Sequence, residues 1–247
     1  MTDLSKILIH CSSLSKITTE PRSKADKDAG LLGETAKSHL IEVYTEQQYD
    51  YRRDNVNKYT NKGNLQEPKA IQVLSSFLGI PMVKNETTIF NEYFVGTPDI
   101  ILPDLKIIFD TKCCYDWITL LDNVLDGLPE ENKRQIDGYL DILGWDTGYV
   151  AKILLDHPQE DIDREKYRLF TLGNYISDES PDFLRLWAEK EKKMRFEQHP
   201  LSERILLFEV KKDEEYIEKA RKKVEKSRIF MQEFSEKHKN FNNNFVF

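Results

Sequence analysis

Apolar positions recur at helical spacing in several segments of the chain. One such stripe begins at Glu34, and a second begins near Glu67, with Pro68 in its first turn and Gly79 at its end. The same spacing predicts further helices at 130–143, 181–196 and 213–238. The chain is therefore expected to contain at least five helices.

Short β-branched or apolar runs, bounded by turn residues, predict the strands. They lie at 87–90, 97–102 and 106–113, which we expect to form a meander, and at 148–155, 167–172 and 205–210. The order of helices and strands predicts a single α/β domain with a central mixed β-sheet flanked by helices. Its N-terminal part would span 1–60, its core 61–156, and its C-terminal strands and long helix 157–247.

Composition excludes several classes of protein. Of the 247 residues, 39% are hydrophobic and 32% charged, and no apolar run approaches a membrane span, so we expect a soluble protein without a membrane partner. The net charge of -7 argues against a protein that coats nucleic acid nonspecifically, but it allows a local basic groove. The cysteines at 11, 113 and 114 form no disulfide framework, which favours a reducing compartment such as the cytoplasm.

Acidic and basic residues converge in one short segment. Asp110 and Lys112 stand two apart on a predicted strand, so they face the same side of the sheet. If this strand pairs with the preceding one, Asp99 comes near Asp110. Burying an Asp and a Lys at the end of the apolar run 107–109 costs free energy unless the two side chains pair or bind a metal. An isolated Asp-x-Lys is, however, more often a solvated pair at the surface.

Two carboxylates and one ammonium suit phosphodiester hydrolysis assisted by Mg²⁺ or Mn²⁺. Hard oxygen ligands would come from Asp99, Asp110 and the main-chain carbonyl of Thr111. The metal would lower the pKa of a bound water, and Lys112 would orient or deprotonate that water and hold the phosphate.

The same residues resemble a known nuclease signature. Gly96-Thr-Pro-Asp99 followed by Asp110-Thr-Lys112 is similar to the PD-(D/E)XK motif. Upstream, Gly63-x-x-x-Glu67 resembles a motif of the exonuclease branch, which would make Glu67 a further acid at the metal site, directly or through a water. Downstream, Gln135-x-x-x-Tyr139 resembles a motif of RecB-type nucleases, whose two side chains share a helix face and would reach the active site or a DNA phosphate.

Over nearly the whole chain the sequence resembles the YqaJ-type viral recombinases, the family of phage lambda exonuclease. The resemblance implies a restriction-endonuclease-like catalytic core in 61–156 and a segment that contacts DNA ends in 1–60. It also implies that Ser12 and Thr97 lie beside the 5′-phosphate of the DNA end. The chain departs from the family in two places. Asp110 stands where Glu is usual, and no arginine precedes Ser12.

These observations lead to one principal hypothesis about function. The protein would be a metal-dependent exonuclease that degrades double-stranded DNA from an end, 5′ to 3′, in phage or prophage recombination or in DNA end processing. The resemblance further implies a single-strand annealing protein as partner, a homo-oligomer in the form of a trimeric ring, and the cytoplasm of a bacterial host.

Other functions and simpler roles stay open at this stage. The chain could be an endonuclease on the same core, or a catalytically silent module that binds DNA ends. Glu67 could merely favour a helix N-terminus. Ser12 and Thr97 could be cap or turn residues, and Gln135 and Tyr139 could be ordinary surface and core residues.

Overall fold

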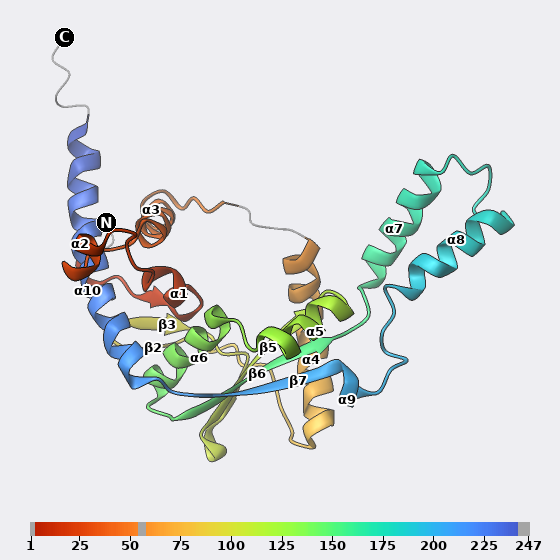
Figure 1. Ribbon diagram of the computed structural model, residues 1–247, viewed down its shortest axis with the longest axis horizontal. Coiled ribbons are helices and arrows are strands. Elements are labelled where there is room, and N and C mark those ends of the chain that lie inside the picture. The colour runs from red at the N-terminus through yellow and green to blue at the C-terminus, as the bar shows by residue number, and fades with distance from the viewer. Residues whose placement is uncertain (1–2, 54–57, 242–247) are drawn as a thin grey trace, which may run out of the picture.

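A four-stranded mixed sheet lies at the centre of the fold (Figure 1). The computed structural model describes residues 3–53 and 58–241. The strands of the central sheet lie in the order β4 (Ile100–Leu102), β5 (Ile107–Cys114), β6 (Thr147–Leu154) and β7 (Ile205–Lys211). β5 pairs antiparallel with β4 and parallel with β6, and β7 is antiparallel to β6. The predicted mixed α/β architecture is confirmed.

A second, smaller sheet contains β1 (Ile9–His10), β3 (Phe94–Gly96) and β2 (Ile89–Phe90), in that order. β1 runs parallel to β3, and both strands therefore end on the same side. The predicted meander is wrong in part. β2 pairs with β3 rather than with β4, and only β4 and β5 form a hairpin, through a 3-10 turn at Pro103–Leu105. Strands as short as β1 and β3 carry too few residues to show a period of two.

Helices pack on both faces of the central sheet. α6 (Glu130–Leu143) buries its apolar side in the same core cluster as Ile108 of β5. α4 (Lys58–Leu78) packs in another cluster with Phe109, the next residue along the strand. Successive side chains of a strand point to opposite faces, so β5 lies between the two helices.

α4 begins well before the predicted start. Glu67 and Pro68 lie inside the helix and not in its first turn, so the prediction from Pro68 is wrong. Burial of Ala70 and Leu74 against the sheet outweighs the one hydrogen bond that a proline inside a helix removes. Glu67 is therefore not a first-turn acid that stabilises the helix dipole, which was the alternative role considered for it.

The N-terminal and C-terminal helices form one end of the molecule (Figure 1). α1 (Leu14–Ile17), α2 (Lys24–Asp28) and α3 (Glu34–Tyr49) follow the 3-10 turns Leu4–Lys6 and Cys11–Ser13. The long helix α10 (Glu214–Asn240) shares a core cluster with α1, α3 and α6. The predicted helices that begin at 34 and 213 are confirmed.

At the opposite end, α7 (Gln159–Leu172) and α8 (Pro181–Lys192) form a helical hairpin that projects from the sheet (Figure 1). The strand predicted at 167–172 is wrong, because Leu169 and Phe170 pack at helical spacing against the cluster around Phe183. The chain returns to β7 through the short helix α9 (Leu201–Arg204). α5 (Trp117–Asp126), which the sequence analysis did not predict, follows β5. None of the described helices is long and apolar enough to cross a membrane.

Candidate active site

The β4–β5 hairpin brings two carboxylates together. Asp99 immediately precedes β4, and because Ile100 lies opposite Phe109, Asp99 falls beside Asp110. One oxygen of Asp99 accepts hydrogen bonds from the backbone N–H of Thr111 at 2.6 Å and from its hydroxyl at 2.8 Å. Burial and then the nearby charge of Asp110 raise the pKa of Asp99 to about 6.

Lys112 completes the group that the sequence predicted. Its Nζ lies 2.7 Å from Oδ2 of Asp110, whose side chain is only 2% exposed. Burial alone would lower the pKa of Lys112, but the charge and contact of Asp110 outweigh it, so the pKa is raised. In this arrangement Lys112 is a cation that can orient water and hold a phosphate. The alternative role of proton acceptor is disfavoured.

A buried hydrogen-bond network connects these strands to α6. Nε2 of Gln135 donates to Oδ1 of Asp110 at 2.9 Å and to the hydroxyl of Tyr139 at 2.9 Å. The Tyr139 hydroxyl in turn donates to the carbonyl of Thr97 at 3.4 Å. A Cβ at Gly96 would lie 2.5 Å from Cε1 of Tyr139, so only glycine leaves room for this ring. The predicted pair on α6 therefore reaches the acidic group.

Glu67 lies apart from the other two acids. Its carboxylate pairs with Lys84 at 3.0 Å, a contact that the sequence analysis did not anticipate. Within residues 3–53 and 58–241, no three His, Cys, Asp or Glu side chains are close enough to form a metal-binding group. Glu67 still contributes to the electrostatic surroundings of Lys112.

Ser12 and Thr97 lie at the same end of the smaller sheet. They follow β1 and β3, whose register places His10 opposite Val95. The exposed Thr97 hydroxyl lies 3.0 Å from that of Thr88. Ser12 lines two hollows of about 290 and 350 Å³, and both are also lined by His39 and Arg52.

Basic side chains that the sequence analysis missed surround Ser12. Lys16 and Arg53 line the hollow of about 290 Å³, and Arg52 lines both hollows. The family resemblance predicts an arginine upstream of Ser12, whereas Arg52 and Arg53 follow α3. No local spacing signals this proximity, because α3 must fold back toward α1 to create it.

Solved structures of two exonucleases are similar to this chain. A phage-related exonuclease from Haemophilus somnus 129PT is 28% identical, with a TM-score of 0.73 over 95% of this chain and 98% of that protein. An alkaline exonuclease, LHK-Exo from Laribacter hongkongensis, is 12% identical, with a TM-score of 0.63 over 99% and 96%. Its complex with dAMP is 13% identical, with a TM-score of 0.58 over 98% and 93%. No family model and no curated protein sequence matches the chain. The structural likenesses confirm the resemblance predicted from the motifs.

Proposed function

Because the chain has the fold of the phage-type PD-(D/E)XK exonucleases, we propose that it is a metal-dependent exonuclease acting on double-stranded DNA ends. The observation that carries the proposal is the grouping of Asp99, Asp110 and Lys112 at one end of the β4–β5 hairpin. The exonuclease neighbours support a nuclease role. The metal, the direction of degradation and the biological context belong to the proposal.

The residues present fit Mg²⁺ or Mn²⁺. Oδ2 of Asp110 is buried, and apart from the Lys112 ammonium at 2.7 Å it has no partner among the described residues. The N–H of Thr111 faces Asp99, on the β4 side of β5. Continuing the β4–β5 pairing two residues beyond Ile100 and Phe109 places Pro98 opposite Thr111. Because proline has no N–H, it cannot donate a hydrogen bond to the carbonyl of Thr111, which leaves this carbonyl available to a metal. Asp99, Asp110 and this carbonyl would hold the metal, with Glu67 acting directly or through a water.

Each side chain has a distinct task in this proposal. Bound Mg²⁺ or Mn²⁺ would activate a water and stabilise charge on the phosphate. Gln135 fixes the orientation of Asp110 through a hydrogen bond to Oδ1, which leaves Oδ2 directed at Lys112. The Lys112 ammonium neutralises phosphate charge and orients the water. Thr111 holds Asp99 in place.

Ser12 and Thr97 support degradation in the 5′ to 3′ direction. Their hydroxyls would donate hydrogen bonds to a terminal 5′-phosphate. Lys16 would supply positive charge, together with Arg52, which also lies 3.8 Å from Glu46. Tyr139 links this end of the smaller sheet to Gln135 and Asp110. A 5′-phosphate bound near Ser12 would thereby set the position of the strand in the active site.

The wider setting follows from the resemblance. We propose phage-type recombination or DNA end processing in a bacterial cytoplasm, with a single-strand annealing protein as partner. A trimeric ring around the DNA is the oligomeric form that this resemblance favours.

Linear and closed circular duplexes test the proposed activity. With Mg²⁺ or Mn²⁺ the protein should degrade only the linear form, whereas Ca²⁺ or excess chelator should prevent cleavage. Lys112→Met should lose at least a hundredfold in rate, while Lys211→Met, which removes an exposed strand lysine, should not. Cleavage of the circle would indicate an endonuclease. Binding without cleavage in every metal would indicate a silent module.

A further inference from the structure

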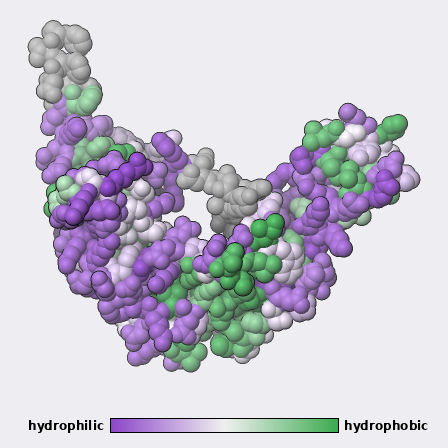
Figure 2. All heavy atoms as spheres, in the orientation of Figure 1, coloured by the Kyte–Doolittle hydropathy of each residue, from purple (hydrophilic) through white to green (hydrophobic). Residues whose placement is uncertain are grey.

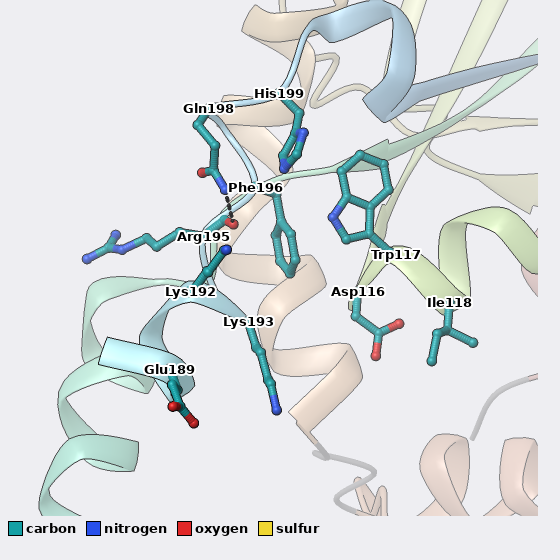
Figure 3. A pocket seen from close by; sticks show the side chains of 10 residues that line it. All are labelled: Asp116, Trp117, Ile118, Glu189, Lys192, Lys193, Arg195, Phe196, Gln198 and His199. Atoms are coloured by element: carbon teal, nitrogen blue, oxygen red, sulfur yellow. Dashed lines mark hydrogen bonds between the residues drawn. The ribbon is translucent and has the colours of Figure 1, made fainter. Parts of the chain in front are cut away.

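A groove lies between the start of α5 and the segment that follows α8 (Figure 3). Its volume is about 610 Å³. Three rings line it, those of Trp117, Phe196 and His199, together with the exposed Lys192 and Lys193. Figure 3 shows the rings gathered at one end of the groove and the side chain of Lys193 extending along the other. None of these residues belongs to the site described above.

The groove opens on the face of the sheet that carries the catalytic group. Asp110, Lys112 and Cys114 alternate along β5, so their side chains point to the same face. Cys114 is buried in a cluster with Phe196, and Trp117 packs against that cluster. The groove and the Asp110–Lys112 pair therefore lie on the same side of the sheet.

The aromatic end of the groove is rigid. The indole of Trp117 packs edge-on against Phe196, with ring centroids 6.2 Å apart, and against His199 at 5.1 Å. Asp116 caps α5 in a reciprocal pair of hydrogen bonds with Thr119, which fixes the backbone at Trp117. Phe196 is 3% exposed, and the Lys62 ammonium lies 5.2 Å from its centroid. Such a platform can stack on a base without reordering.

The rest of the groove carries charges of both signs, since Asp116 and Glu189 line it together with the basic residues. The side chains of Lys192 and Lys193 make no salt bridge or hydrogen bond with any described residue. Arg195 differs from them, because it pairs with Glu191 at 3.1 Å and lies 3.7 Å from Asp156. The two lysines are therefore the cations that remain available to phosphates in this groove.

We infer that this groove binds single-stranded DNA next to the active site. A base would stack on Trp117, and the flanking phosphates would lie near Lys192 and Lys193. Inside a duplex both faces of each base are covered by its neighbours, so an indole in this groove selects unpaired bases over the interior of a duplex. The inference rests on the proposed function, and its ligand is the strand that remains single when its partner is degraded.

The neighbouring surface of α5 suits the same ligand. Hydrophobic residues gather over α5 in Figure 2. They include Ile118, Leu121 and Leu125, whose exposed fractions are 70%, 52% and 86%. Unstacked bases that continue beyond Trp117 would contact this apolar surface, while the phosphates remain on the lysine side.

Binding of a fluorescent dodecathymidylate to the full chain, in excess chelator so that nothing is cut, tests the inference. The oligonucleotide should quench tryptophan fluorescence, and Trp117→Leu should abolish most of the quenching, although Trp145 and Trp187 remain. Trp117→Leu should also weaken binding roughly 5- to 150-fold. The double variant Lys192→Glu/Lys193→Glu, which changes only exposed side chains, should weaken binding at least tenfold and reduce its salt dependence.

The control is Lys237→Glu/Lys239→Glu, which makes the same charge change on exposed residues in the last turn of α10. It should bind like the wild type. Equal weakening by the two double variants would overturn the inference, as would binding and quenching that Trp117→Leu leaves intact. Quenching by dAMP at the same concentration as the oligonucleotide would also overturn it, since the groove would then be a mononucleotide site.

A parallel assay on linear duplex with Mg²⁺ separates this inference from the proposed function. Hydrolysis by the wild type, together with binding that the groove variants do not change, would refute the groove alone. Absence of hydrolysis in every metal, with binding weakened by the groove variants, would refute the exonuclease and keep the groove.

Discussion

At the residue scale, the surroundings of Asp99 act on its pKa in opposite directions. Two hydrogen bonds from Thr111 to the Asp99 carboxylate favour ionisation, whereas burial and the charge of Asp110 oppose ionisation. The balance raises the pKa from an ordinary 3.8 to about 6. An acid with a raised pKa in the folded state contributes stability below its unfolded pKa, and this stability is lost as the pH rises through the folded value. At neutral pH, without metal, ionised Asp99 therefore destabilises the fold.

Asp99→Asn should make the metal-free protein more stable at pH 7.5. The amide keeps an acceptor for Thr111 and removes the charge, which we expect to be worth about 1–3 kcal/mol, or roughly 2–4 °C of melting temperature per kcal/mol. The gain should vanish near pH 4, and cleavage should fall at least a hundredfold. Thermal unfolding at both pH values measures the effect. The control is Asp104→Asn at the exposed hairpin turn, and a lower melting temperature for Asp99→Asn at pH 7.5 would contradict the argument.

Ser12→Ala should affect only one kind of DNA end. Loss of a hydroxyl that donates to a phosphate should cost about 1–3 kcal/mol, roughly 5- to 150-fold in rate, on 5′-phosphorylated duplex. The loss should shrink on 5′-hydroxyl ends, where the phosphate is absent. Initial rates on the two substrates give the comparison, with Ser13→Ala as the neighbouring control. An equal loss on both ends would remove the support for a 5′-phosphate pocket.

The grouping of the candidate catalytic residues could be predicted because they are close in sequence. Asp99, Asp110 and Lys112 lie on one hairpin, so the alternation of a strand is enough to place them together. Arg52 could not be predicted in this way, because its approach to Ser12 depends on how α3 packs. Lys84, the partner of Glu67, was missed for the same reason.

At the scale of elements, α4 is anchored by a buried lysine. Lys62 is 1% exposed, and its Nζ donates to the carbonyls of Tyr115 at 2.9 Å and Leu155 at 2.7 Å, just beyond the ends of β5 and β6. One turn later, Gln66 donates to the carbonyl of Asp156 at 3.0 Å. These bonds fix α4 against the sheet and so determine where Glu67 lies. Burial lowers the pKa of Lys62 to about 8.

Lys62→Met should destabilise the protein by about 1–3 kcal/mol. The variant leaves two buried carbonyls without a donor, and relief from burying a charge offsets part of that loss. Because the folded pKa is depressed, the wild type should gain stability relative to Lys62→Met as the pH rises from 8 toward 10.5. Denaturant unfolding across this range measures both effects.

The control for this prediction is Lys69→Met on the same helix. Lys69 pairs with Glu197 at the surface, and such pairs contribute at most about 1 kcal/mol. If the two variants are equally stable at every pH, the buried lysine does not anchor α4.

Elements with a clear apolar period were the ones that the sequence predicted. The stripes in α6 and α10 lie against the core, and their predicted boundaries agree with the structure to within about two residues. The run at 167–172 was assigned to a strand because local alternation does not reveal the partner of Phe170, which is Phe183 on α8. α5 also carries apolar residues at helical spacing, at 117, 120, 121, 124 and 125, so a longer pass along the sequence would have found it.

At the scale of the whole molecule, the α7–α8 hairpin has a hydrophobic core of its own. Its own small cluster contains Ile162, Phe183, Trp187 and Met194, none of which belongs to the clusters that pack on the central sheet. A unit with few buried contacts opens at a lower free energy than the core.

We expect the hairpin to open before the sheet unfolds. Amide hydrogens of α7 and α8 should exchange faster than those of β5 and β6, and a protease should first cut between Gly173 and Ser180. Mass spectrometry of both reactions locates the sites. A fragment that is cut there and still melts with the cooperativity of the intact protein would show that the core folds without the hairpin. Equal protection of hairpin and sheet would contradict this expectation.

The N-terminal segment cannot make its contacts with α10 until α10 has been synthesised. Lys223 donates to Glu20 at 3.1 Å and to the carbonyl of Leu31 at 2.8 Å, and Arg228 donates to the carbonyl of Ile7. Glu20 and Lys223 are 203 positions apart, which a ribosome takes roughly 10–40 s to traverse. The strands that carry Asp99, Asp110 and Lys112 are therefore synthesised well before the helix that fixes the segment around Ser12. During translation, the nascent chain therefore acquires the proposed catalytic residues before it completes the support for the proposed DNA-end pocket.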